Sequence, residues 1–128
     1  MSAFLLDTHT FIWLTENNAR LPDNLRDTID NADLVYVSMA SLWEIAIKLQ
    51  IGKLSLQRQY ETIESIINNS DILILPISFA DTIQISILPS HHGDPFDRML
   101  IVQAINRSLV IVSTDEKFDL YAVQRIWE

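Results

Sequence analysis

Residues 3–7, Ala3-Phe4-Leu5-Leu6-Asp7, form a short apolar run that ends in a single carboxylate. A run of this length, closed by a polar residue, is typical of a strand that is buried on both faces. Similar apolar runs follow along the chain at residues 34–37, 72–75, 109–112 and, more weakly, 123–127. Longer segments with helical spacing separate these runs, so the sequence predicts an α/β fold with a mostly parallel sheet.

The composition restricts both the architecture and the chemistry of the protein. The chain has 128 residues, of which 48% are hydrophobic, and contains no linker or repeat, so we expect a single domain over residues 1–128. The absence of cysteine excludes disulfides, thiolate metal ligands and cysteine nucleophiles. No apolar stretch reaches membrane-spanning length and the first residues lack a basic segment, so we expect no membrane association and a cytoplasmic location.

The formal net charge of −8 at pH 7 argues against a broad nucleic-acid-binding surface. Non-specific affinity for nucleic acids comes mainly from Lys and Arg side chains that neutralise phosphates. A polyanionic substrate would therefore have to be held locally, by a metal ion and a few basic side chains.

Proline and glycine mark the expected ends of two helices. Gly52 follows a helical segment at the position where a helix C-terminus is expected. Pro95 suits the first position of a helix over residues 96–106, which makes Asp94 the natural N-cap of that helix. Asp97 then lies in the first turn, where the helix dipole favours an ionised carboxylate.

Four carboxylates that are far apart in the sequence are each placed to reach one edge of such a sheet. Asp7 and Asp115 follow the first and fourth predicted strands, and ligands of open α/β sheets bind at the carboxyl ends of strands. Glu44 and Asp97 lie on helices that begin near the same edge. Carboxylates gathered without neutralising bases repel one another, so the cluster is tolerable mainly around a hard divalent cation. The sequence therefore predicts a metal-dependent phosphodiester hydrolase.

Each carboxylate also has a purely structural interpretation. Asp7 and Asp115 precede helical segments and could be simple N-caps, which the sequence leaves open. Glu44 could form an exposed pair with Lys48, four residues further on. The segment around Glu44 is apolar nearly all round, however, so we favour a carboxylate that faces a cavity or a cation.

The histidines His9, His91 and His92 do not suggest a zinc site. They lack the spacing of known zinc motifs, and two adjacent histidines cannot easily share one ion. We expect these side chains in surface loops and ordinary polar contacts. Phosphate-binding glycine loops and the G-x-S-x-G motif of serine hydrolases are also absent from the sequence.

Five motifs along nearly the whole chain occur in a familiar order. They are Leu5-Leu6-Asp7-Thr8-His9, residues 37–48, Gly52-Lys53-Leu54, residues 92–100 and Ser113-Thr114-Asp115. The blocks Trp43-Glu44-Ile45 and Asp94-Pro95-Phe96-Asp97-Arg98 are the most specific. In these motifs the chain resembles the PIN-domain ribonucleases, in particular the VapC-like toxins of type II toxin–antitoxin pairs.

This resemblance implies a PIN-like three-layer α/β/α fold with a mostly parallel five-stranded sheet. It assigns metal binding and catalysis to one acidic quartet, Asp7, Glu44, Asp97 and Asp115. It further implies Mg²⁺ or Mn²⁺ as cofactor, endonucleolytic cleavage of RNA, inhibition by a cognate antitoxin, and a homodimer.

Basic and hydroxyl side chains near the same edge complete the predicted site. Lys48 and Arg98 are placed to orient a phosphate, although Arg98 has the alternative of an ion pair with a neighbouring carboxylate. Thr8, Ser38 and Thr114 are predicted to supply hydrogen bonds that orient the metal ligands.

Two other functions compete with this hypothesis. A phospho-acceptor receiver domain is also α/β with an acidic magnesium pocket, but it needs an aspartate at the end of the third strand, where this chain has Leu75-Pro76-Ile77. It also needs a lysine at the end of a late strand, where this chain has Ser113-Thr114-Asp115. An inactive interaction module that keeps the fold is the second alternative, and the complete acidic quartet argues against it.

Overall fold

A computed structural model describes residues 2–127 and shows five strands that alternate with helices. The strands are β1 (Ala3–Leu6), β2 (Leu34–Ser38), β3 (Ile72–Leu75), β4 (Val110–Val112) and β5 (Gln124–Ile126). The helices are α1 (Thr8–Thr15), α2 (Asp23–Asp30), α3 (Met39–Gln50), α4 (Thr62–Asn68), α5 (Phe79–Ile87), α6 (Pro95–Arg107) and the 3-10 helix η1 (Glu116–Leu120). The predicted strands are all present, with some ends shifted by a single residue.

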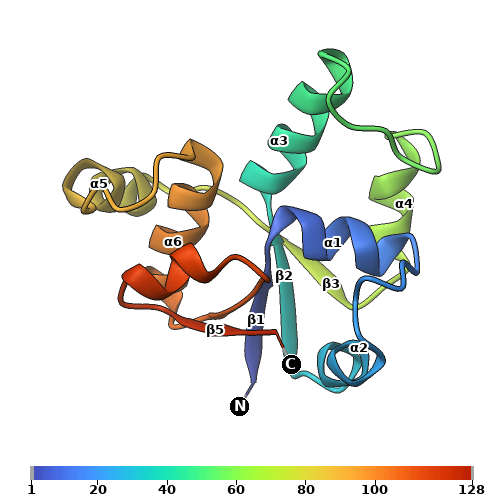
Figure 1. Ribbon diagram of the computed structural model, residues 1–128, viewed down its shortest axis with the longest axis horizontal. Coiled ribbons are helices and arrows are strands. Elements are labelled where there is room, and N and C mark those ends of the chain that lie inside the picture. Colours follow the sequence, from blue (N-terminus) through green and yellow to red (C-terminus); the bar gives the residue numbers. More distant parts are fainter. Residues whose placement is uncertain (1, 128) are drawn as a thin grey trace.

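The sheet is parallel throughout, and its strand order is β3-β2-β1-β4-β5 (Figure 1). β1 is therefore central, and Leu6 aligns with Val37 on one side and with Val112 on the other. Receiver domains of the flavodoxin-like type have the order 2-1-3-4-5. The receiver-domain alternative is therefore wrong, because β1 here lies between β2 and β4.

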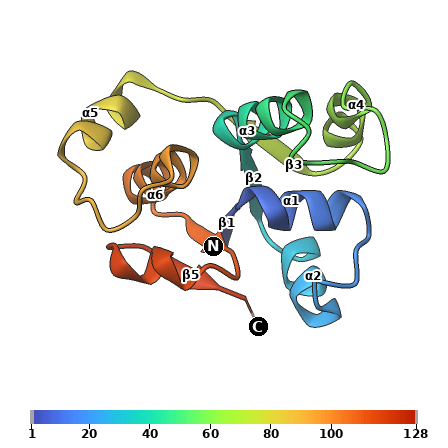
Figure 2. The same cartoon turned by 45° about the horizontal axis from the view of Figure 1, so that its top comes forward.

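Helices cover both faces of the sheet and give the three layers seen in Figure 2. Phe4 and Leu6 point to one face, where they pack in a core with residues of α1, α2, α3 and α4. Leu5 points to the opposite face, where it packs with residues of α6 and η1. This alternation along β1 is the period-two pattern of a strand that is buried on both faces.

The ends of α3 and α6 follow from local sequence. The hydroxyl of Ser38 accepts the backbone N–H of Ala40 (3.0 Å) and caps α3, and Gly52 takes a positive φ of 74° just beyond the end of this helix. Asp94 caps α6 ahead of Pro95, as the sequence predicts. Among residues 2–127, no helix combines the length and the apolar character needed to cross a membrane.

Candidate metal centre

All four predicted carboxylates reach the C-terminal edge of the sheet. Asp7 directly follows β1, and Asp115 stands three residues beyond the end of β4. Glu44 lies in α3, which begins directly after β2, and Asp97 lies in the first turn of α6. Because β1 is hydrogen-bonded to both β2 and β4, the first three of these segments are neighbours in space.

Asp7 is both a helix cap and a buried acid. One carboxylate oxygen accepts the backbone N–H of Thr10 (2.9 Å), which caps α1, and the other accepts the hydroxyl of Ser113. The side chain is almost fully enclosed, and this burial raises the pKa of Asp7 although both hydrogen bonds act to lower it. The N-cap interpretation of Asp7 is thus correct, and it does not remove the carboxylate from the candidate site.

Glu44 is buried, so the interpretation as an exposed Glu–Lys pair is wrong. Its exposed fraction is 4%. Oε1 accepts the hydroxyl of Thr8 at 2.6 Å, and Oε2 pairs with the ammonium of Lys48. Oγ of Thr8 also lies 3.0 Å from Oγ of Ser41, so three polar side chains of α1 and α3 meet inside the fold. The hydrogen bond to Glu44 raises the pKa of Lys48, which keeps its ammonium charged.

The sequence analysis expected an ionised carboxylate at Asp97, in the first turn of α6, but its surroundings in the structure favour the protonated form. Burial, followed by the charges of the other carboxylates, raises the pKa of Asp97 to about 8. Those charges belong to Asp94, Asp7, Glu44 and Asp115. The other three members of the predicted quartet therefore all act on Asp97.

The donor set fits a hard divalent cation. The groups are carboxylate oxygens without thiolates, and an opposite charge placed among them would relieve the repulsion that raises the pKa of Asp97. Asp97 and Asp115 form a group with His92 in which the ligand atoms all lie within 4.8 Å of one another. Asp7 and Glu44 do not belong to this group, although their charges act on Asp97.

Asp94 is the cap of α6 and not a member of this group of three residues. One of its oxygens accepts the backbone N–H groups of Phe96 (2.8 Å) and Asp97 (3.1 Å). The predicted role of Asp94 as the cap of α6 agrees with these bonds. The side chain of Asp97 is 21% exposed, which leaves its carboxylate an approach from solvent.

His92 was missed by the sequence analysis, which expected it in a surface loop. Its exposed fraction is only 8%, and its Nε2 lies 3.0 Å from Oδ2 of Asp97 and 3.3 Å from Oδ2 of Asp115. Its neighbour His91 is exposed, as expected. The adjacent polar residues of this loop gave no signal that one ring points inward, because the partners that hold it come from distant segments.

Of the three hydroxyl residues predicted to orient the carboxylates, only one contacts a carboxylate of the quartet in the structure. Thr8 contacts Glu44, as described above, whereas Ser38 is buried as the cap of α3. Thr114 is exposed, and its neighbour Ser113 is the buried residue that links two of the acids. The hydroxyl of Ser113 donates to Asp7 and accepts the backbone N–H of Asp115 (2.9 Å).

Arg98 contacts backbone carbonyls in place of a carboxylate. Its guanidinium donates to the carbonyls of Leu88 (3.2 Å), Pro89 (3.0 Å) and His92 (3.2 Å). The alternative of an ion pair with Asp94 or Asp97 is therefore wrong. Arg98 holds the loop that leads into α6 and presents His92 to the acids.

Comparison with known proteins decides the family. The profile described as PIN domain matches residues 4–124, which include all four carboxylates of the quartet. The chain belongs to the PIN-domain family. No curated protein sequence matches the chain significantly.

Solved structures share the PIN-domain fold of this chain at low sequence identity. DNA-bound VapBC from Salmonella typhimurium is 20% identical, with 98% of each chain covered and a TM-score of 0.73. VapBC2 from Rickettsia felis, bound to a DNA fragment from its promoter, is 15% identical, with 98% of this chain and 99% of that chain covered and a TM-score of 0.74. FitAcB from Neisseria gonorrhoeae is 17% identical, with 96% of each chain covered and a TM-score of 0.64. At these identities the similarity establishes the fold.

Proposed function

We propose that this PIN-domain protein is a Mg²⁺-dependent endoribonuclease, with Mn²⁺ as a possible substitute, and the toxin of a toxin–antitoxin pair. One observation carries the catalytic part of the proposal: burial and the surrounding carboxylates raise the pKa of Asp97 to about 8. The folded state of a protein that gathers carboxylates in this way becomes more stable when a divalent cation binds among them. The fold shared with VapBC structures and the resemblance to VapC-like toxins support the biological role.

The residues of the site have distinct proposed tasks. Asp7, Glu44, Asp97 and Asp115 would hold the metal. Mg²⁺ bound there supplies stabilisation of the charge that develops on the phosphoryl oxygens and lowers the pKa of an attacking water. Thr8 and Ser113 fix the orientation of the carboxylates that they contact.

Lys48 is the proposed contact for the RNA phosphate. Its side chain is 35% exposed, its ammonium pairs with Glu44, and the carboxylates of Asp94 and Asp97 help to keep it charged. Lys48 therefore offers a local positive charge on an otherwise acidic protein. A polyanionic substrate such as RNA requires such a charge in order to bind. The guanidinium of Arg98 is already hydrogen-bonded to three carbonyls, so we assign it to the loop and not to the substrate.

Cleavage of labelled RNA tests the catalytic proposal directly. The wild-type protein should cut single-stranded RNA internally in Mg²⁺ and lose this activity in EDTA, and Asp97→Asn should be inactive in both conditions. Asp27→Asn, which changes an exposed carboxylate on α2, is the matched control and should remain active. A pure wild-type protein without metal-dependent cleavage of any RNA would favour the non-catalytic interaction module.

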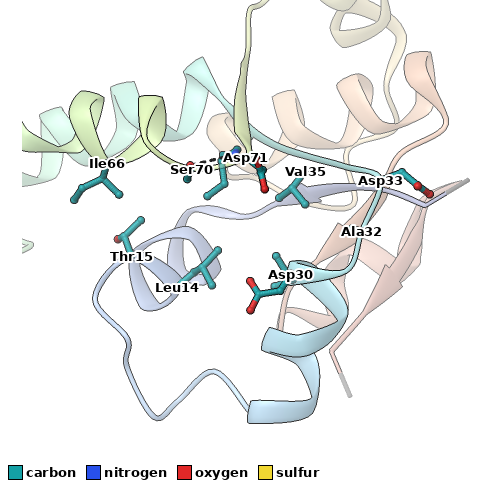
Figure 3. Close-up of a pocket in the computed structure, with 11 residues that line it drawn as sticks. Leu14, Thr15, Asp30, Ala32, Asp33, Val35, Ile66, Ser70 and Asp71 are labelled. Carbon is teal, nitrogen blue, oxygen red and sulfur yellow. Dashed lines mark hydrogen bonds between the residues drawn. The ribbon is translucent and has the colours of Figure 1, made fainter.

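An apolar groove is the proposed site for the antitoxin. It has a volume of about 390 Å³, lies beside the C-terminal end of α1, and is bordered by three carboxylates, Asp30, Asp33 and Asp71 (Figure 3). An amphipathic segment with an apolar face and basic flanks would complement both features. Co-expression with the product of a small neighbouring reading frame should give a stable complex, and Ala32→Lys, which opposes both the apolar face and the basic flanks of the partner, should weaken it.

The exposed face of α5 is the proposed homodimer contact. Phe79, Ile83 and Ile87 follow one another at four-residue spacing, and their exposed fractions are 81%, 53% and 72%. An apolar cleft of about 260 Å³ that includes Trp43 and Phe96 lies next to this helix. Light scattering at micromolar concentration should show a dimer that Ile87→Lys dissociates, and a strictly monomeric wild-type protein would rule out the dimer.

A further inference from the structure

The ring of His92 has a defined hydrogen-bonding direction. Its Nδ1 accepts the backbone N–H of Asp94 at 3.2 Å, so this nitrogen carries a lone pair and no hydrogen. In a neutral imidazole the hydrogen must then be on Nε2. That N–H group is directed at Oδ2 of Asp115, 3.3 Å away, and lies 3.0 Å from Oδ2 of Asp97.

This tautomer decides between two interpretations of the same cluster. His92, Asp97 and Asp115 together have the spacing of a three-ligand metal site, because their ligand atoms lie within 4.8 Å of one another. A histidine binds a metal through the lone pair of a ring nitrogen. The lone pair of Nδ1 accepts the N–H of Asp94, and Nε2 carries the hydrogen. The ring is therefore a donor toward the carboxylates and not a ligand beside them.

Several contacts from other segments hold the ring in this position. The backbone N–H of His92 donates to the hydroxyl of Tyr121 at 2.7 Å, and this hydroxyl donates to the carbonyl of Pro89 at 2.9 Å. Arg98 donates to the carbonyls of both Pro89 and His92. On the inner side the imidazole packs against the ring of Phe118, with 6.1 Å between centroids. The loop is thus fixed from α6 and from the segment around η1.

We propose that His92 is a positioning residue of the candidate metal centre, which holds the carboxylates of Asp97 and Asp115 in register from outside the coordination sphere. Asp97 is carried by α6 and Asp115 by the segment after β4, and the donor between them fixes how these two elements present their oxygens. Tyr121 and Arg98 act through His92, because they fix its loop. The proposal rests on the metal-dependent function proposed above.

Two variants of His92 distinguish the role of its N–H donor from the role of its aromatic ring. His92→Gln keeps an N–H donor near the position of Nε2 but loses the ring, whereas His92→Phe keeps a ring against Phe118 but has no donor. Mn²⁺ binding, measured by titration calorimetry, should weaken by roughly 10- to 100-fold in His92→Phe and change by less than about threefold in His92→Gln. Equal weakening in both variants, or unchanged binding in His92→Phe, would overturn the proposal.

A measurement on the wild-type protein does not depend on the folding of either variant. Electron spin echo envelope modulation of bound Mn²⁺ detects a directly coordinated imidazole nitrogen, and we expect none from His92. A nitrogen coupling that is present in the wild-type protein and in His91→Gln, but disappears in His92→Gln, would show that His92 is a ligand. His91 is the suitable control because it is the adjacent, exposed imidazole.

These readouts distinguish failure of the inference from failure of the proposed function. If the wild-type protein binds Mn²⁺ in the expected His92-dependent way but cleaves no RNA, the positioning role stands and the nuclease function falls. If RNA is cleaved with Mg²⁺ while His92→Phe binds Mn²⁺ as tightly as the wild type, the nuclease function stands and the positioning role falls.

Discussion

Replacing Asp97 by asparagine is expected to stabilise the metal-free protein and to remove its response to Mg²⁺. Asparagine keeps the shape of the side chain but cannot ionise, so it does not add to the repulsion among the carboxylates. The folded protein holds the Asp97 proton more tightly than the unfolded chain does, because the pKa of this carboxyl is raised from 3.8 to about 8. Stability of the metal-free wild-type protein should therefore fall as the pH rises through this window.

The size of the effect follows from the pKa of Asp97. Each unit of pKa corresponds to about 1.4 kcal/mol, so ionisation of Asp97 above pH 8 costs about 6 kcal/mol as an upper bound. Local relaxation and water entry reduce this cost, and the side chain is already 21% exposed. We expect Asp97→Asn to gain on the order of 2 kcal/mol in the free energy of unfolding at about pH 9, or roughly 6–10 °C in Tm.

Thermal unfolding at two pH values is the appropriate assay. In EDTA, the wild-type protein should melt lower at about pH 9 than at about pH 6, whereas Asp97→Asn should lose most of this difference. Millimolar Mg²⁺ should raise the Tm of the wild-type protein above its Tm in NaCl of matched ionic strength. At a Mg²⁺ concentration one hundred times its Kd, the free energy of unfolding should rise by about 2.7 kcal/mol. The variant should respond to the two salts alike.

The matched control is Asp27→Asn, which removes one negative charge from the exposed side of α2. It should keep both the pH dependence and the Mg²⁺ response of the wild-type protein. If Asp97→Asn is no more stable than the wild type at about pH 9 in EDTA, the carboxylates do not repel one another as the pKa of Asp97 indicates. The same conclusion follows if Asp27→Asn shows as large a gain.

Three further predictions concern single contacts of the fold and the site. Asp94→Ala should lower the free energy of unfolding in urea by about 1 kcal/mol, because the helix cap is lost. Asp94→Asn should keep most of the stability and most of the RNA cleavage, since asparagine also caps helices. An inactive Asp94→Asn variant would show that Asp94 is a metal ligand. Thr8→Val should cost on the order of 1–3 kcal/mol, because it removes the 2.6 Å hydrogen bond of buried Glu44, and an unchanged urea midpoint would contradict this. Burial opposes the ionisation of Asp81, but its hydrogen bonds, led by that from Arg107, outweigh burial and lower the pKa of this carboxyl. The ionised carboxylate of Asp81 therefore contributes to stability above about pH 4, and this contribution is lost in acid. Asp81→Asn should therefore be less stable at neutral pH and show a flatter decline in acid, and two parallel stability curves would refute the assignment.

Much of the fold follows from local patterns in the sequence. The apolar runs predict the five strands to within a residue at each end, because strands buried on both faces have few polar positions. Asp94, Pro95 and Gly52 mark helix ends for reasons that act within a few residues. The strand order could not be derived in this way, since the pairing of β1 with β4 depends on contacts between distant parts of the chain.

The candidate site shows the same division between local and distant causes. Glu44 could be singled out because a carboxylate in a nearly apolar helix has few acceptable surroundings. His92 could not, because its burial depends on Tyr121, 29 residues further along the chain. Nor could the sequence decide between Ser113 and Thr114, since both are hydroxyl residues after the same strand and only the structure shows which of them turns inward.

The central position of β1 has a consequence for the synthesis of the protein. β1 leaves the ribosome about 100 residues before its second partner, β4, because Leu6 aligns with Val112. The hydroxyl that holds Asp7 comes from Ser113, 106 residues later. At about 5–20 residues per second, an incomplete chain spends seconds without an assembled cluster of acids. A nascent chain that ends before β4 therefore has no complete centre, so the proposed activity would begin only after β4 has been made.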